Sequence, residues 1–215
     1  MTKLLLVIAV MLAPASALAE KATYDLVRYT PPPAWKKVAW KKDVKDKNTI
    51  SYTVTDKQTR TYCQIFLLRS TTSKGSVTAD FDSDWKNIIV KSYAVKDPPT
   101  LTDTAAEDGW EVKAGVATFE FDQGTSIAML TTITGYDRSV SIVAVTSSQD
   151  YIPAIQDLLG SVEMTKPKAD AAATKPAADK PAAKAGAAKP TALQGYMDYN
   201  PFTKTWTWKL RYPPK

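Results

Sequence analysis

Apolar and polar residues alternate over several runs between residues 23 and 164, which is the period of a half-buried β-strand. Turn-forming residues bound each run, so the pattern predicts strands rather than helices. The predicted strands are 24–30, 49–56, 61–70, 110–122, 125–137 and 138–148. Short turns separate the last three, which favours an antiparallel meander.

The apolar period changes to that of an amphipathic helix in two places. Over 77–93, Phe81, Trp85 and Ile88 stand at i, i+4 and i+7. A second helix is predicted over 150–160, "DYIPAIQDLLG", where a glycine is the last residue.

The order of these elements, with "TPPPAW" at 30–35 and "DGW" at 108–110, resembles PsbP-like domains over residues 23–164. Ala34 departs from the family, which often has Gly between this Pro and Trp. The resemblance implies an exported α/β domain that docks to a larger envelope or membrane assembly without catalysis, and it carries over no functional residue. We therefore expect an α+β fold: a central antiparallel sheet of about six strands covered by two helices, a PsbP-like sandwich.

Residues 1–19 have the organisation of a secretory signal peptide. Lys3 precedes a short apolar run, and an A-x-A-like series ends at Ala19. The single cysteine, Cys63, lies far from this cleavage point, so a lipoprotein is not expected. No later stretch reaches the roughly 18 apolar residues of a membrane helix. These features predict an exported, soluble protein without a transmembrane segment, periplasmic or secreted.

The mature chain divides into three parts. Residues 20–164 form the predicted core domain. Residues 165–191 consist mainly of Lys, Ala and Pro and lack the apolar side chains needed for a core, so they predict a disordered spacer. Residues 192–215 form a short aromatic and basic tail with a hairpin-like pattern.

Positive charge is concentrated outside the core. The whole chain has a net charge of +6, but residues 20–164 hold 17 Lys and Arg against 19 Asp and Glu, a net of −2. A nucleic-acid reader carries its positive charge on a folded face, so no nucleic-acid partner is expected.

Candidate catalytic and metal-binding groups do not form a recognisable motif. The chain contains no His, which removes Ser-His and Cys-His catalysis and His-ligated metals. The remaining candidates each lack the context of their motif, and no cofactor, metal or catalytic residue is assigned. They are "GTSIA" at 124–128, "SDWK" at 83–86, the Asp80, Asp82 and Asp84 series, and the pair Glu120 and Asp122.

Cys63 alternates with apolar residues in "TYCQIFLLR". A buried apolar position is the main interpretation. An intermolecular disulfide is the alternative that an odd cysteine in an exported protein permits.

The tail reads as a strand with an apolar and a basic face, preceded by a turn at "NPFTK". Three interpretations stay open: it docks on the core or is a poorly ordered end, it adds a strand to a partner's sheet, or it contacts an anionic lipid or glycan surface. A truncated second domain would look similar. The predicted partner-binding residues are Trp206, Trp208, Tyr212, Lys204, Lys209 and Arg211.

These observations predict an exported, non-catalytic binding or assembly module of the bacterial cell envelope, with the tethered tail docking to an envelope protein or an anionic surface. The alternative is a hydrolase with an unrecognised Ser or carboxylate site.

Overall fold

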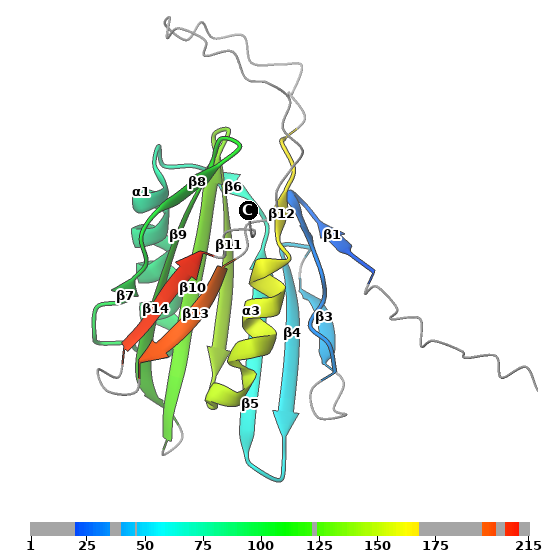
Figure 1. The fold of residues 1–215 in the computed structure, drawn as a ribbon, viewed down its shortest axis with the longest axis vertical. Helices are drawn as coiled ribbons and strands as arrows, with labels where there is room; N and C mark the ends of the chain where they lie inside the picture. The colour runs from blue at the N-terminus through cyan, green and yellow to red at the C-terminus, as the bar shows by residue number, and fades with distance from the viewer. Residues whose placement is uncertain are drawn as a thin grey trace, which may run out of the picture.

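The computed structural model describes residues 20–34, 40–45, 47–121 and 124–167, and the strand backbones 195–200 and 205–210 (Figure 1). Its main element is an antiparallel sheet of nine strands in the order β3-β4-β5-β11-β10-β9-β7, with β6 paired to β11 and β8 paired to β9. The nine strands are β3 (Lys41–Lys45), β4 (Thr49–Asp56), β5 (Thr61–Leu68), β6 (Thr71–Thr72), β7 (Thr100–Leu101), β8 (Ala105–Glu107), β9 (Trp110–Phe121), β10 (Gly124–Gly135) and β11 (Arg138–Thr146).

Two smaller sheets complete the β-structure. The first has the order β1-β2-β12 and joins the two ends of the core. The second is the hairpin β13–β14 near the C-terminus. Their strands are β1 (Ala22–Tyr24), β2 (Val27–Tyr29), β12 (Glu163–Met164), β13 (Gly195–Asn200) and β14 (Thr205–Leu210).

The predicted α+β class with about six strands is wrong, because the described chain is mostly β with two short helical segments. Five of the six predicted runs are strands of the nine-stranded sheet, and the run 24–30 instead folds into part of the hairpin β1–β2. The strands that the pattern missed, β3, β6, β7 and β8, have two to five residues and mostly polar side chains. Such short strands are held mainly by backbone pairing with a longer neighbour, so they show no apolar alternation.

Both helical segments lie where the period predicts them. The first is continuous over 77–93 and consists of α1 (Val77–Asp84), the π-helix η1 (Trp85–Val90) and α2 (Lys91–Tyr93). It ends at Ala94, which has a left-handed φ of 51°. The second consists of the 3₁₀ turn η2 (Gln149–Tyr151) and α3 (Ile152–Gly160).

The two helical segments cover opposite faces of the large sheet (Figure 1). On the α3 face, Ile155 and Leu158 join buried sheet residues such as Ile65. On the α1 face, Phe81 and Trp85 stack with ring centroids 5.6 Å apart and pack with buried β10 and β11 residues. Burial on both sides explains the nearly continuous apolar runs of the central strands.

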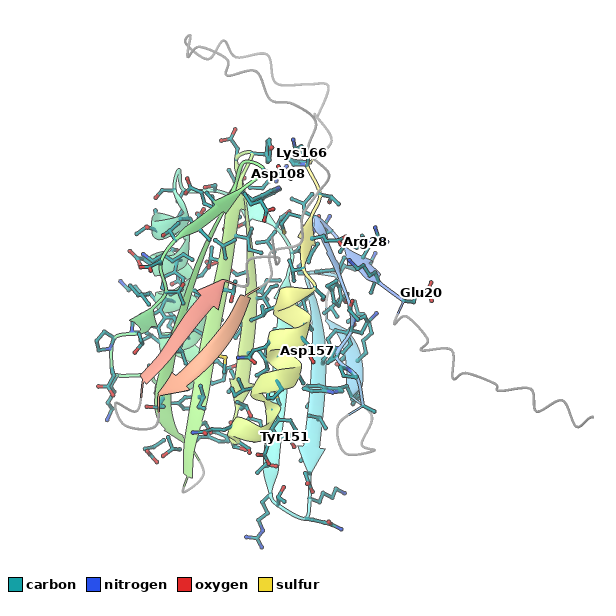
Figure 2. The ribbon with its side chains drawn as sticks, in the orientation of Figure 1. Glu20, Arg28, Asp108, Tyr151, Asp157 and Lys166 are labelled. Carbon is teal, nitrogen blue, oxygen red and sulfur yellow. The ribbon has the colours of Figure 1, made fainter. Side chains whose placement is uncertain are left out.

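The α3 segment runs along the length of the sheet. Tyr151, at its beginning, lies at one end of the molecule, and Lys166, after β12, lies near Asp108 at the other end (Figure 2). Lys166 Nζ lies 5.3 Å from the centroid of the Tyr136 ring.

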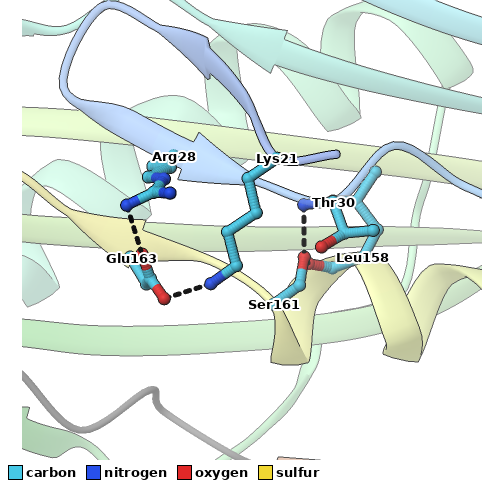
Figure 3. A network of polar contacts seen from close by, with 6 residues as sticks. All are labelled: Lys21, Arg28, Thr30, Leu158, Ser161 and Glu163. Carbon is cyan, nitrogen blue, oxygen red and sulfur yellow. Dashed lines mark hydrogen bonds and ion pairs between the residues drawn. The ribbon is translucent and has the colours of Figure 1, made fainter. Parts of the chain in front are cut away.

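The first and last elements of the core are joined by a polar network (Figure 3). Glu163 of β12 pairs with Lys21, and its Oε2 lies 3.8 Å from Nη1 of Arg28 in β2. Ser161 Oγ accepts a hydrogen bond from the Thr30 amide at 2.8 Å and donates one to the Leu158 carbonyl at 2.7 Å. These contacts support a folding unit that begins near residue 20 and closes near residue 164.

None of the helices in the described part of the chain is long and apolar enough to cross a membrane. The predicted signal peptide, 1–19, and residues 168–191 of the predicted spacer lie outside the described residues.

Candidate functional site

Strand β9 is paired from Glu111 to Phe121 on its inner side, but only in part on its outer side. Its inner neighbour is β10. On the outer side, β8 pairs with its beginning and β7 pairs with Gly115 and Val116. Within the part of the chain that the structure describes, no strand pairs with the outer side of residues 117–121. We call this segment the β9 edge.

Two residues of the β9 edge direct their backbone polar groups outward. On the outer side of the strand, the Ala114 carbonyl accepts a hydrogen bond from the Thr102 amide at 2.9 Å, and the Ala114 amide donates to Thr102 Oγ1 at 3.1 Å. The backbone groups of successive residues point to alternate sides of a strand. The amide and carbonyl groups of Thr118 and Glu120, both exposed residues, therefore also point to the outer side.

The sequence before β7 explains why pairing stops there. Pro98 and Pro99 immediately precede β7, and proline has no amide hydrogen to donate to a ladder. Pro99 packs over Gly115 instead: a Cβ atom at Gly115 would lie 3.1 Å from Pro99 Cβ and 2.6 Å from Phe81 Cζ. The chain thus approaches β9 closely at Gly115 without forming a strand beside the β9 edge.

Four aromatic residues gather at this end of the α1 face, and we call them the aromatic cluster: Tyr62, Tyr93, Phe119 and Phe121. Ring centroids lie 6.1 Å apart for Tyr62 and Phe121, 5.4 Å for Tyr93 and Phe119, and 6.4 Å for Phe119 and Phe121. Phe119 is buried, whereas Phe121 is 56% exposed. The cluster therefore extends the α1-face core to the surface beside the β9 edge.

The hydroxyl groups of this cluster have different surroundings. Tyr62 Oη lies 3.3 Å from Ser126 Oγ, within hydrogen-bonding distance. Burial, with a smaller contribution from the nearby Tyr62, raises the pKa of Tyr93 above its ordinary value. The phenol of Tyr93 therefore stays neutral at physiological pH, and the cluster offers an apolar surface that carries phenol hydroxyl groups.

A second group of polar residues lies under α1. Asp80 accepts hydrogen bonds from Ser73 Oγ at 2.7 Å, the Lys74 amide at 2.7 Å and Thr134 Oγ1 at 2.8 Å. One helical turn later, Asp84 accepts a hydrogen bond from Ser141 Oγ at 2.6 Å. We call these residues, together with Thr132 and Ser139, the polar seam, because they join α1 to β10 and β11.

The hydrogen bonds of the polar seam hold α1 on the sheet. Burial by itself would raise the pKa of Asp80, but the hydrogen bonds from Lys74, Ser73 and Thr134 outweigh it, so the pKa lies below its ordinary value. Ser141 is 3% exposed, and its oxygen is also 3.1 Å from Thr132 Oγ1. A hydroxyl group with these internal partners is poorly placed to attack a substrate.

The other residues considered in the sequence lie apart from one another. Ser126 of "GTSIA" is buried in β10, Lys86 of "SDWK" is exposed on the helix, and Glu120 accepts a hydrogen bond from Thr125 on the strand surface. Asp122 lies outside the described residues. In the described ranges, no group of three or more Cys, Asp and Glu residues is placed to hold a metal ion.

The interpretation of Cys63 as a buried residue is confirmed. Its side chain is fully buried in the α3-face core. Burial raises the pKa of the Cys63 thiol to about 12, so it remains protonated at physiological pH. A protonated, inaccessible thiol is a poor nucleophile for disulfide exchange.

The predicted partner-binding residues of the tail are described only as backbone or not at all. Trp206, Trp208 and Lys209 belong to β14, whereas Lys204, Arg211 and Tyr212 lie outside the described residues. Their role in binding stays a prediction.

The β9 edge was missed in the sequence because an alternating strand looks the same whether one or both of its sides are paired. Two signals could have indicated it: the Pro98-Pro99 pair before the strand, and Phe119 and Phe121 continuing the apolar alternation to its end.

Searches against protein-family models and curated proteins found no match for this chain.

Proposed function

We propose that this protein is an exported, non-catalytic binding module that accepts an extended segment of a partner along the β9 edge. The observation that carries the proposal is the unpaired outer side of residues 117–121 next to the exposed ring of Phe121. Export follows from the signal-like residues 1–19, and the envelope is the expected compartment.

The backbone of the β9 edge supplies the affinity. Thr118 and Glu120 present outward amide and carbonyl groups, and an added strand would pair with these groups as in a normal antiparallel or parallel ladder. The inner side of the same segment is paired with β10 over its full length, which holds the edge in an extended conformation before a partner arrives. This preorganisation reduces the ordering cost of binding.

The aromatic cluster supplies the selectivity. Side chains of an added strand alternate between the two faces of the sheet. On the α1 face they would lie beside Phe119 and Phe121, where apolar or aromatic side chains gain most from burial. On the other face they would lie beside Thr118 and Glu120, where a basic side chain is favoured. The site therefore fits a strand with apolar residues on one face and a basic residue on the other.

The hydrolase alternative has less support. The Ser141 and Asp84 pair is the closest approach to a Ser-carboxylate dyad among the described residues, and it is committed to holding α1 on the sheet. Its hydroxyl is buried beneath the helix, so a substrate would require α1 to move.

The proposal is tested by selecting displayed 12-residue random peptides on the full mature protein and measuring the affinity of the selected synthetic peptides. Phe121→Ser should weaken binding at least tenfold because it removes the exposed ring. The matched control is Val44→Ser on β3, since Val44 is 54% exposed, close to the 56% of Phe121. Equal affinity of the two variants for every selected peptide would refute the proposed site.

A further inference from the structure

Two elements lie on the α3 side of the large sheet, and only one of them is a helix. In Figure 1, α3 lies over the β5 and β11 side, and the hairpin β13–β14 lies in front of β9 and β10. The backbones of β13 and α3 are close neighbours, so the hairpin occupies the same layer as the helix.

The hairpin lies in front of an apolar part of the sheet. Val116 of β9 pairs with Met129 of β10, and Ile127 follows two residues away on the same face. All three are buried members of the α3-face core. We call them the β9–β10 strip. A surface of this kind on a folded protein requires a cover, because exposed contiguous apolar area is unfavourable in water.

The hairpin has a matching apolar face. Its register pairs Met197 with Trp208 and Tyr199 with Trp206. Paired residues share a face of an antiparallel hairpin, so these four residues and Leu210 belong to one face. The other face consists of polar residues and one tyrosine: Tyr196, Asp198, Asn200, Thr205, Thr207 and Lys209. An isolated two-stranded hairpin is marginal in water, so this one requires a surface on which to bury its apolar face.

We propose that the β9–β10 strip is the docking surface of the chain's own C-terminal hairpin, which returns across the spacer and binds with its apolar face. Charge also favours this contact, since residues 191–215 carry a net +3 and residues 20–164 a net −2. A spacer of this length and composition reaches on the order of 80 Å when extended. Tethering gives the hairpin an effective concentration of about millimolar. Even a weak docking surface is then mostly occupied, and the hairpin can still leave it.

The hairpin surface adjoins the proposed strand-binding site at Thr118, which pairs with Ile127, but the two proposals rest on different residues. The β9–β10 strip is on the α3 face, whereas the aromatic cluster is on the α1 face. An experiment that refutes one proposal therefore does not refute the other.

The test compares melting temperatures of full-length mature chains. Replacing Trp206 and Trp208 together with Ser should lower the melting temperature by about 3 °C or more, because one kcal/mol shifts a domain of this size by a few degrees. The control is Thr205→Ser with Thr207→Ser, on the opposite face of the hairpin, which should change it by less than about 1 °C. An equal effect of the two double variants would overturn the proposal.

A second measurement uses a protease site inserted at Gly186 in the spacer. The intact chain should melt at the same temperature at all protein concentrations. After cleavage the hairpin fragment dissociates on dilution, so a tenfold dilution should lower the melting temperature toward that of the Trp variant. A cleaved chain that melts like the intact one at every concentration would contradict reversible docking.

The outward-facing interpretations of the tail are outcomes of the same experiment. If the Trp variant keeps the wild-type melting temperature but loses binding to phosphatidylglycerol vesicles, the hairpin serves an anionic surface and the proposal fails. Substitution of Gln for Lys204, Lys209 and Arg211 would then abolish vesicle binding. High salt would weaken vesicle binding of the wild type.

Discussion

Two segments of the nine-stranded sheet have an unpaired outer side within the described residues, β3 and the β9 edge, and their chemistry differs. At one edge, β3 reads "KKDVK", with four charged residues in five. At the other, the β9 edge reads "ATFEF", with one charged residue and two phenylalanines. Both edges carry an exposed apolar side chain, Val44 or Phe121, but only Phe121 belongs to an aromatic cluster that reaches the core through the buried Phe119.

This contrast indicates that charged side chains protect the β3 edge against pairing with an added strand, whereas the β9 edge has little such protection. A short edge strand rich in Lys disfavours pairing with a foreign strand, because the added strand would have to desolvate and approach the charges. The β9 edge lacks this protection, and its outward backbone groups at Thr118 and Glu120 lie next to an apolar surface. The two edges therefore differ in how strongly charge disfavours the pairing of an added strand.

The largest expected effect is a difference in stability, because a side chain of the β9 edge is packed in the core and one of β3 is not. Phe119→Ala should lower the free energy of unfolding by about 3 to 5 kcal/mol, because Phe119 is buried in the α1-face core. Val44→Ala should change it by less than about 0.5 kcal/mol, because Val44 is exposed. Urea unfolding of both variants measures the difference. A loss below about 1 kcal/mol for Phe119→Ala would mean that the β9 edge is not anchored in the core.

Proline substitution tests which side of β9 is free. Ala117→Pro removes an amide that points toward β10 and should cost about 3 kcal/mol. Thr118→Pro removes an outward amide, so it should cost much less while weakening binding of a selected peptide. Urea unfolding and peptide titration of both variants provide the two measurements. Equal destabilisation by the two substitutions would show that both sides of the strand are paired.

Low pH should lower the stability of the fold by protonating Asp80, which holds α1 on the sheet. The folded-state pKa of Asp80 is lowered, so its stabilising contribution is present above its unfolded pKa and is lost as the pH falls through its folded pKa. Asp80→Asn should cost about 2 kcal/mol at pH 7, in the range of hydrogen bonds to charged groups. Urea unfolding between pH 7 and pH 2 should show the wild type approaching the variant as the pH falls. A constant difference across this range would contradict the role of the Asp80 charge.

The smallest expected effect concerns the charged edge. Changing Lys41, Lys42 and Asp43 of β3 to Thr should leave the stability within about 1 kcal/mol but strengthen self-association, because the edge loses its charges. Sedimentation velocity at increasing protein concentration measures the change. A variant that stays as monomeric as the wild type would show that charge does not protect this edge.

The sequence pattern predicted the long strands and both helical segments because their apolar faces are buried in the two cores. Phe81 and Trp85, for example, are buried on the helix as their spacing indicates. The number of strands was underestimated, because β3, β7 and β8 are held by backbone pairing and leave no apolar period.

The candidate site could not be predicted in the same way. Tyr62, Tyr93 and Phe119 come from three separated segments, and only the fold brings them together. Whether the outer side of residues 117–121 has a neighbour depends on strand order, which local sequence does not determine. The polar seam has the same origin, since Asp80 and Thr134 are 54 residues apart.

Amide hydrogen exchange of the free full-length protein tests the central claim most directly. The account predicts fast exchange for the Thr118 and Glu120 amides, which point outward, and slow exchange for the neighbouring Ala117 and Phe119 amides, which face β10. Addition of a selected peptide should slow exchange at Thr118 and Glu120. If these two amides are already as protected as Ala117 and Phe119 in the free protein, the β9 edge is covered and the proposed binding site does not exist.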